Sequence, residues 1–91
     1  MGIKRKIKHA MKPHKKMTLE KFKRKFDKAI KQRIFLDVPK AMIILKDKTS
    51  LVATDYKTHT YDGITFVDLI YEFGGQSDVF TVPLDDIIDV Y

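Results

Sequence analysis

The sequence predicts an α+β protein in which a basic arm and one amphipathic helix precede a small antiparallel β-barrel of five to six strands. Three observations predict it. Apolar residues recur at helical spacing as far as Arg33, short β-branched and aromatic runs fill the rest, and the turns between those runs are too tight for parallel crossovers. The predicted units are an arm over residues 1–16, a helix within 17–33 and the barrel over 34–91. A chain of 91 residues has room for one small core.

Charge divides the chain at the same place. Residues 1–33 carry fourteen Lys and Arg against two acidic residues, a net +12, whereas residues 34–91 carry four against ten, a net −6. The overall charge of +6 hides this asymmetry. A basic third attached to an acidic remainder is typical of an interaction arm and favours a polyanionic partner.

The arm has a weak helical pattern. Ile3, Ile7 and Met11 recur at four-residue steps before Pro13, so a helix here would carry a thin apolar stripe among lysines. Isolated helices of this length are marginal in water. We therefore expect residues 1–16 to be disordered when free and to order on a partner.

The helix that follows has clear start signals. Thr18 is placed to cap it, Glu20 lies in the first turn where the helix dipole favours an anion, and Met17 and Phe22 occupy the hydrophobic-staple positions. The helix should therefore begin at about Leu19.

This helix has two chemically different sides. At 100° per residue one side is apolar and the other cationic; the apolar side holds Leu19, Phe22, Phe26, Ala29 and Ile30, and the cationic side holds Lys21, Arg24, Lys25, Lys28 and Lys31. An ordinary solvated helix face mixes charge signs to gain pairs four residues apart. The unmixed cations therefore favour a binding surface, with a plain solvated face as the alternative.

The first predicted hairpin lies directly after the helix. Residues 34–38 read as a strand that ends at Pro39, and residues 41–45 are apolar on both faces, so the apolar side of the helix is expected to cover one of them. The polar residues 46–49 form a turn that leads into a strand over 50–56.

The second half of the barrel is predicted from its turns. Asp62-Gly63 is a strong turn pair, and the strand over 64–73 is apolar on both faces except around Asp68, where we expect a bend that serves two sheet layers. Gly74-Gly75 opens a turn that runs to about Asp78. A strand over 79–82, a 3₁₀ turn over 83–86 and a last strand over 87–91 complete the chain.

The order of these elements resembles small SH3-like or Sm-like barrels over residues 34–91. The resemblance rests on the long central strand, the Gly-Gly hairpin and the single turn before a short final strand. The Gly and Asn residues that mark true Sm proteins are missing, and residues 57–61 stand where they would be expected. The resemblance therefore concerns the fold and does not identify a family. A barrel this small buries only about 60% of its unfolded surface, which makes the docked helix part of the core.

Catalytic, metal and cofactor chemistry is not indicated. The chain has no Cys, and His9 and His14 are five residues apart, which misses the spacing of a helical metal site. The sequence contains no nucleophile elbow, P-loop or dinucleotide fingerprint. We expect no enzyme activity, cofactor, metal or small-molecule substrate.

Targeting signals are not indicated either. No apolar stretch approaches the roughly 20 residues of a membrane-spanning helix. The apolar residues at the start, Ile3 and Ile7, are separated by three cations, so a secretory signal is not expected. We expect a cytoplasmic protein.

The leading functional hypothesis is a nucleic-acid-binding module. Lys outnumbers Arg, and Lys is a flexible point charge without the planar fork that reads guanine, so the contacts should be largely sequence-independent and made to phosphates of DNA or RNA. A loop over 57–61 is expected to add a cation and a ring that stacks on unpaired bases. The candidate contact residues are Lys4, Arg5, Lys6, Lys8, Lys12, Lys15, Lys16, Lys21, Arg24, Lys25, Lys28, Lys31, Lys57 and Tyr61.

Two other functions stay open. The acidic barrel is suited to a regulatory module that binds a larger protein, or to a homo-oligomer in which one copy's arm lies on its neighbour. The basic arm also suits a peripheral protein on anionic membrane, at about 1 kcal/mol per cation near the surface, although the absence of Trp makes insertion weak.

Overall fold

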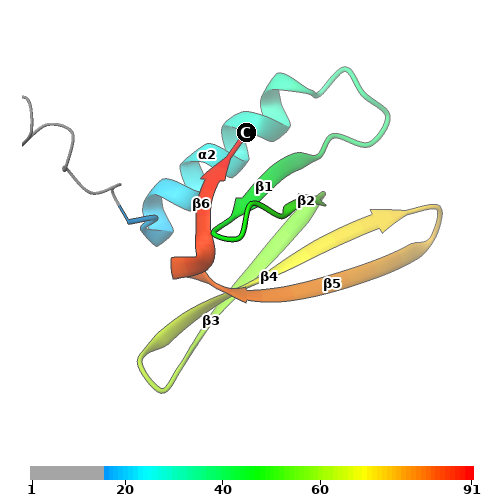
Figure 1. Ribbon diagram of the computed structural model, residues 1–91. Coiled ribbons are helices and arrows are strands. Elements are labelled where there is room, and N and C mark those ends of the chain that lie inside the picture. The colour runs from blue at the N-terminus through cyan, green and yellow to red at the C-terminus, as the bar shows by residue number, and fades with distance from the viewer. Residues whose placement is uncertain (1–15) are drawn as a thin grey trace, which may run out of the picture.

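The computed structural model describes residues 16–91, which form one long helix and six antiparallel strands in two sheets (Figure 1). Sheet A has the order β2-β1-β6 and sheet B the order β3-β4-β5. The predicted arm lies almost wholly outside the described residues. The elements are α2 (Leu19–Gln32), β1 (Ala41–Leu45), β2 (Ser50–Ala53), β3 (Asp55–Tyr61), β4 (Ile64–Phe73), β5 (Gln76–Pro83), the 3₁₀ turn η1 (Leu84–Asp86) and β6 (Ile87–Val90).

The start of α2 is confirmed. Thr18 is its N-cap, and the Thr18 hydroxyl accepts a hydrogen bond of 3.1 Å from the Lys21 N–H. Met17 and Phe22, the predicted staple pair, are both buried in the same core. The cap satisfies one of the free N–H groups of the first turn, and the staple sets the direction in which the chain enters the helix.

The predicted strand over residues 34–38 is wrong. These residues form turns after the helix, and the side chains of Ile34 and Phe35 are 73% and 78% exposed. The Leu36 N–H donates to the Arg33 carbonyl at 2.9 Å, and the Arg33 guanidinium donates to the Lys40 carbonyl at 3.3 Å, so local bonds satisfy the backbone instead of a neighbouring strand. A short apolar run forms a strand only where a neighbouring strand is available to pair with it, so the pattern alone does not decide.

The bend between the two sheets lies at Thr54 rather than at Asp68. Strand β2 leads through this single residue into β3, so one stretch of chain serves both sheets. The Thr54 N–H donates to the Ile70 carbonyl at 2.7 Å, and the Thr54 hydroxyl accepts from the Glu72 N–H at 3.0 Å. Asp68 instead lies within regular pairing of β4 with both neighbours.

Residues 57–61 belong to β3 and are not the loop that the sequence predicts. They pair with β4 through a tight turn at Asp62 and Gly63, whose φ angles are 54° and 78°. Asp and Gly tolerate this left-handed conformation, as the turn prediction required. The second hairpin turns at Gly74 and Gly75, so β5 begins earlier than expected.

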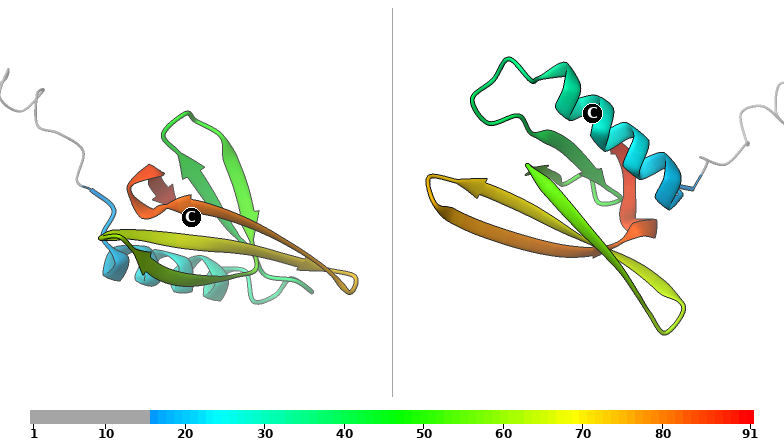
Figure 2. Two further views of the ribbon diagram at one scale, coloured as in Figure 1. Left: turned by 90° about the horizontal axis from the view of Figure 1, so that it is seen from below. Right: turned by 180° about the vertical axis from the view of Figure 1, so that it is seen from behind.

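The core lies between the sheets and beneath the helix. Phe22 and Phe26 pack on Tyr56 of β3, with ring centroids 5.0 and 4.8 Å from that of Tyr56. The remaining core side chains come from both sheets and η1, among them Ile43, Leu45, Ala53, Val67, Leu69, Val82, Leu84, Ile87 and Val90. The helix, which lies alongside β1 and β6 (Figure 2), is thus part of the core.

The strands form two three-stranded antiparallel sheets, and the chain passes from one sheet to the other where β2 leads into β3. Six strands, their antiparallel pairing and the helix agree with the predicted α+β class. No helix within residues 16–91 has the length and apolar character needed to cross a membrane.

Candidate nucleic-acid interface

The cationic side of α2, called here the basic face, consists of Lys21, Arg24, Lys25, Lys28 and Lys31. The helical repeat that buries Phe22, Phe26 and Ala29 places these five residues away from the centre of the core. Arg24, Lys28 and Lys31 are exposed, whereas Lys21 and Lys25, nearer the core side of the helix, are half-buried.

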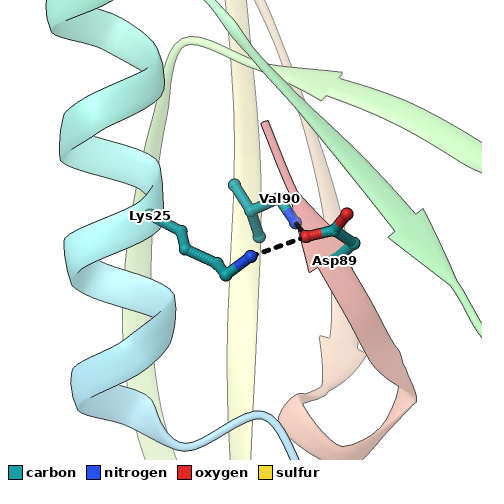
Figure 3. Close-up of polar contacts among 3 residues, drawn as sticks. All are labelled: Lys25, Asp89 and Val90. Carbon is teal, nitrogen blue, oxygen red and sulfur yellow. Dashed lines mark hydrogen bonds and ion pairs between the residues drawn. The ribbon is translucent and has the colours of Figure 1, made fainter. Parts of the chain in front are cut away.

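Two of the five cations are engaged by carboxylates. The Lys25 Nζ lies 2.9 Å from Asp89 Oδ1 of β6 (Figure 3). The Lys31 Nζ lies 3.0 Å from Asp27 Oδ2 one turn earlier in the helix. Within residues 16–91, Lys21, Arg24 and Lys28 form no ion pair. Most of the basic face therefore stays available to a foreign anion.

The Lys25–Asp89 pair fastens the helix to β6. The hydrogen bond from the Lys25 ammonium holds the pKa of Asp89 below its ordinary value. Partial burial raises this pKa, but the effect is outweighed. The Val90 N–H, which donates to Asp89 Oδ1 at 2.8 Å, and the charge of Lys21 lower it further. The two side chains are 35% and 47% exposed, so solvent screening limits the pair to about 1 kcal/mol or less. Lys25 thus positions the helix rather than standing free.

Removal of this pair should give a small stability loss that depends on pH. Folding lowers the pKa of Asp89, so the ionised carboxylate adds to the free energy of unfolding at any pH above the pKa that Asp89 has in the unfolded chain. This added stability is lost as the pH falls through the lower pKa of the folded protein. Asp89→Asn should lower Tm at pH 7 by up to about 8 °C, and the gap should narrow as the pH falls below the ordinary carboxyl pKa of about 4. Thermal unfolding followed by circular dichroism from pH 2.5 to 7 measures this, with exposed Asp85→Asn as the control. A gap that persists at the acid end contradicts the assignment.

A groove runs between the basic face and β6. Its volume is about 450 Å³, and its lining residues are Arg24, Lys25, Lys28, Ala29, Gln32, Asp89, Val90 and Tyr91. Its apolar lining comes from Ala29 and Val90, and Arg24 and Lys28 supply cations that have no carboxylate partner among the described residues. An anion in this groove would meet Arg24 and Lys28 from one helix, and the Asp89 carboxylate of the same lining is paired with Lys25.

Sequence reasoning missed two of the residues that line the groove, Gln32 and Tyr91. Gln32 lies four residues after Lys28, so the helical repeat that located the basic face also contained the signal for Gln32. Tyr91 reaches the groove only because β6 pairs with β1 next to the helix, and no local pattern carries that information.

The structure does not bring Lys57 and Tyr61 to the basic face. Side chains alternate along β3, and Tyr56 points at the helix, so Lys57, His59 and Tyr61 lie on the opposite face of sheet B. His59 stacks on Phe66 there, with centroids 5.7 Å apart, and Tyr61 is 75% exposed.

The charge around Lys57 is unfavourable for phosphate. The same face of sheet B carries Asp55, Asp68 and Glu72, which the antiparallel register places beside and beyond the Lys57 position. Thr81 donates a hydrogen bond to Asp68 Oδ1 at 2.6 Å, across the β4–β5 pairing. A polyanion that lies on the basic face therefore has no second cationic surface here.

Other predicted contact residues lie before the described part of the chain. Lys16 is exposed where the chain enters α2. The remainder, Lys4, Arg5, Lys6, Lys8, Lys12 and Lys15, lie outside residues 16–91, as do His9 and His14. Among the described residues, no three His, Asp or Glu side chains are grouped to hold a metal ion.

Comparison of the chain with models of known protein families, with curated proteins and with solved structures gives no match.

Proposed function

We propose that this protein binds nucleic acid through largely sequence-independent contacts between phosphates and the basic face of α2, together with the cations of residues 1–16. The observation that carries the proposal is that Lys21, Arg24 and Lys28 have no carboxylate partner among residues 16–91, although ten acidic residues follow Arg33. A protein that used these cations for its own stability would fold them onto its aspartates.

Electrostatics supports a phosphate ligand over a neutral one. Three unpaired cations within two helical turns repel one another and cost some helix stability, and an anion that lies across them relieves this repulsion. Phosphate contacts release condensed counterions from the nucleic acid, which makes binding favourable at moderate salt. The groove beside α2 gives the ligand a concave place to approach Arg24 and Lys28.

We infer that the strands that carry α2, and with it the basic face, have the SH3-like or Sm-like arrangement that the order of elements in the sequence resembles. Strand β2 continues into β3 through Thr54, and η1 precedes the short β6, which pairs with β1. This order supports the inference by giving the path of a small barrel opened into two sheets.

Binding to random-sequence oligonucleotides tests the proposal. We expect the full-length protein to bind a 20-base-pair duplex with affinities that agree within about threefold between unrelated sequences, because phosphate contacts carry no base information. Fluorescence anisotropy at 50 and 100 mM salt measures this, with single-stranded DNA and RNA of the same length alongside. Indifference to all these polyanions at about 100 mM salt contradicts the proposal.

A protein partner is the second candidate function, and one observation favours it. Ile34 and Phe35 project from the turn after α2 and are 73% and 78% exposed. Exposed apolar side chains beside polar surface are common at protein interaction sites. If anisotropy shows no polyanion binding, this turn is the surface to test next.

A further inference from the structure

The β4–β5 hairpin projects beyond the rest of sheet B (Figure 1). Pairing of β3 with β4 ends at Asp55 and Ile70, so Tyr71 to Phe73 pair with β5 alone. All six residues from Gln76 to Thr81 are exposed. A two-stranded ribbon is marginally stable in water, so this hairpin gains most from a further strand.

The outer edge of β5 is the natural place for that strand. Sheet B has β5 as its last strand, so one row of backbone N–H and C=O groups has no partner strand within residues 16–91. Natural edge strands are usually protected by Lys, Pro or a covering element. Before its terminal Pro83, β5 carries one charged residue, Asp78, and exposes Val79 and Phe80 at 58% and 52%.

The other edges are better protected. The β3 edge carries Asp55, Lys57 and His59 in alternation. The outer side of β6 lies beside α2, to which the Lys25–Asp89 pair joins it. Of the β3, β5 and β6 edges, that of β5 is the least protected.

An apolar groove lies next to this edge. It has a volume of about 540 Å³ between β2 and the β4–β5 hairpin. Its lining residues are Ser50, Leu51, Val52, Leu69, Tyr71, Asp78, Val79 and Phe80. Side chains of an added strand would therefore find apolar surface as well as backbone partners.

We propose that two copies of this chain associate through their β5 edges, antiparallel about a two-fold axis, to form one continuous six-stranded sheet. In this arrangement the same strand edge of each copy supplies the donors and acceptors for the other. The assembly therefore ends at two copies. The proposal is independent of nucleic-acid binding, since it uses no residue of the basic face.

The available apolar area suits a dimer. Phe73, Val79 and Phe80 are each more than half exposed, and together they leave on the order of 300 Å² open, since a whole aromatic side chain contributes about 150–250 Å². A standard interface buries about 800 Å² per partner, of which somewhat more than half is apolar. The half-buried Leu51, Val52 and Tyr71 line the groove beside Val79 and Phe80 and extend this apolar surface.

Charge and side-chain parity restrict the register. A two-fold axis perpendicular to the sheet places opposite residues on the same face, so a residue of β5 faces itself or one an even number of positions away. A register that centres on Asp78 would place two carboxylates in contact, which is unfavourable. The neighbouring registers centre on Val79 or on Phe80 and avoid this.

Single cysteines test the proposal because the chain has none of its own. In the proposed dimer, Val79→Cys or Phe80→Cys places two sulfurs on opposite residues whose Cα atoms are about 4.5–5.5 Å apart, within the range of a disulfide. Under mild oxidation one of these variants should run almost wholly as a cross-linked dimer on a non-reducing gel. Ser77→Cys and Tyr61→Cys are the controls; neither residue faces its own copy, and both should stay uncross-linked.

The solution mass gives the second readout. Sedimentation equilibrium of the full chain at about 100 µM, in 0.5 M salt and after nuclease treatment, should give twice the chain mass. Val79→Lys should return it to the monomer mass with an unchanged circular dichroism spectrum, because an edge lysine disfavours strand addition. A monomeric wild type, a dimer unaffected by Val79→Lys, or equal cross-linking of all four cysteine variants would overturn the proposal.

Discussion

Replacing Arg24 and Lys28 together by glutamate should weaken duplex binding by on the order of 100-fold. Each side chain is exposed beside the α2–β6 groove and has no carboxylate partner among residues 16–91. A hydrogen bond to a charged group contributes about 1.5 kcal/mol or more, so loss of two such contacts gives this factor. Because neither side chain contributes to the core, Tm should change by less than about 3 °C.

The control for this variant changes the charge by the same amount elsewhere. Lys23→Glu with Lys48→Glu reverses two exposed cations that do not line the groove. This pair should weaken binding by less than about fivefold, through long-range charge alone. If the two double variants lose affinity equally, the protein responds to net charge, and the basic face has no special role.

Phe22→Asp should leave the protein unfolded at 25 °C. The Phe22 side chain is fully buried between Phe26 and Tyr56, at the point where the helix meets sheet B. Truncation of a buried Phe costs about 3–5 kcal/mol, and an unpaired buried carboxylate adds several more. That sum approaches the whole stability of a chain of this size, which is on the order of 5–14 kcal/mol.

Phe35→Asp is the matched control, since it makes the same chemical change at a side chain that is 78% exposed. Its far-ultraviolet circular dichroism and Tm should match those of the wild type, whereas the Phe22 variant should lose its cooperative transition. A folded Phe22→Asp protein would show that the helix is an accessory on an independently stable β-structure.

Local signals in the sequence were enough to predict the helix and most turns. Thr18 caps α2, and Asp62-Gly63 and Gly74-Gly75 turn the chain with positive φ, because each of these features depends on neighbouring residues. The buried side of α2 also follows from the helical repeat, and it is the repeat that placed the cations of the basic face outward.

The errors have a common physical cause, which is that sheet pairing is a tertiary property. Ile34 and Phe35 have strand-forming side chains but no neighbouring edge, whereas the polar residues 57–61 become a strand because β4 lies beside them. For the same reason the engagement of Lys25 by Asp89, 64 residues away, was invisible in the sequence. The sequence predicts a loop for Lys57 and Tyr61, but alternation along β3 sets them on the face of sheet B opposite Tyr56.

The most direct test of the central claim, that the basic face is reserved for phosphates, is the salt dependence of duplex affinity for the wild type and the Arg24/Lys28 double variant. If about seven phosphates are neutralised by the wild type and about five by the variant, the slope of log K against log salt is about −6 for the wild type and about −4.5 for the variant, at roughly 0.9 per phosphate. Anisotropy titrations between 50 and 200 mM salt measure both slopes. Equal slopes for the two proteins would show that Arg24 and Lys28 contact no phosphate.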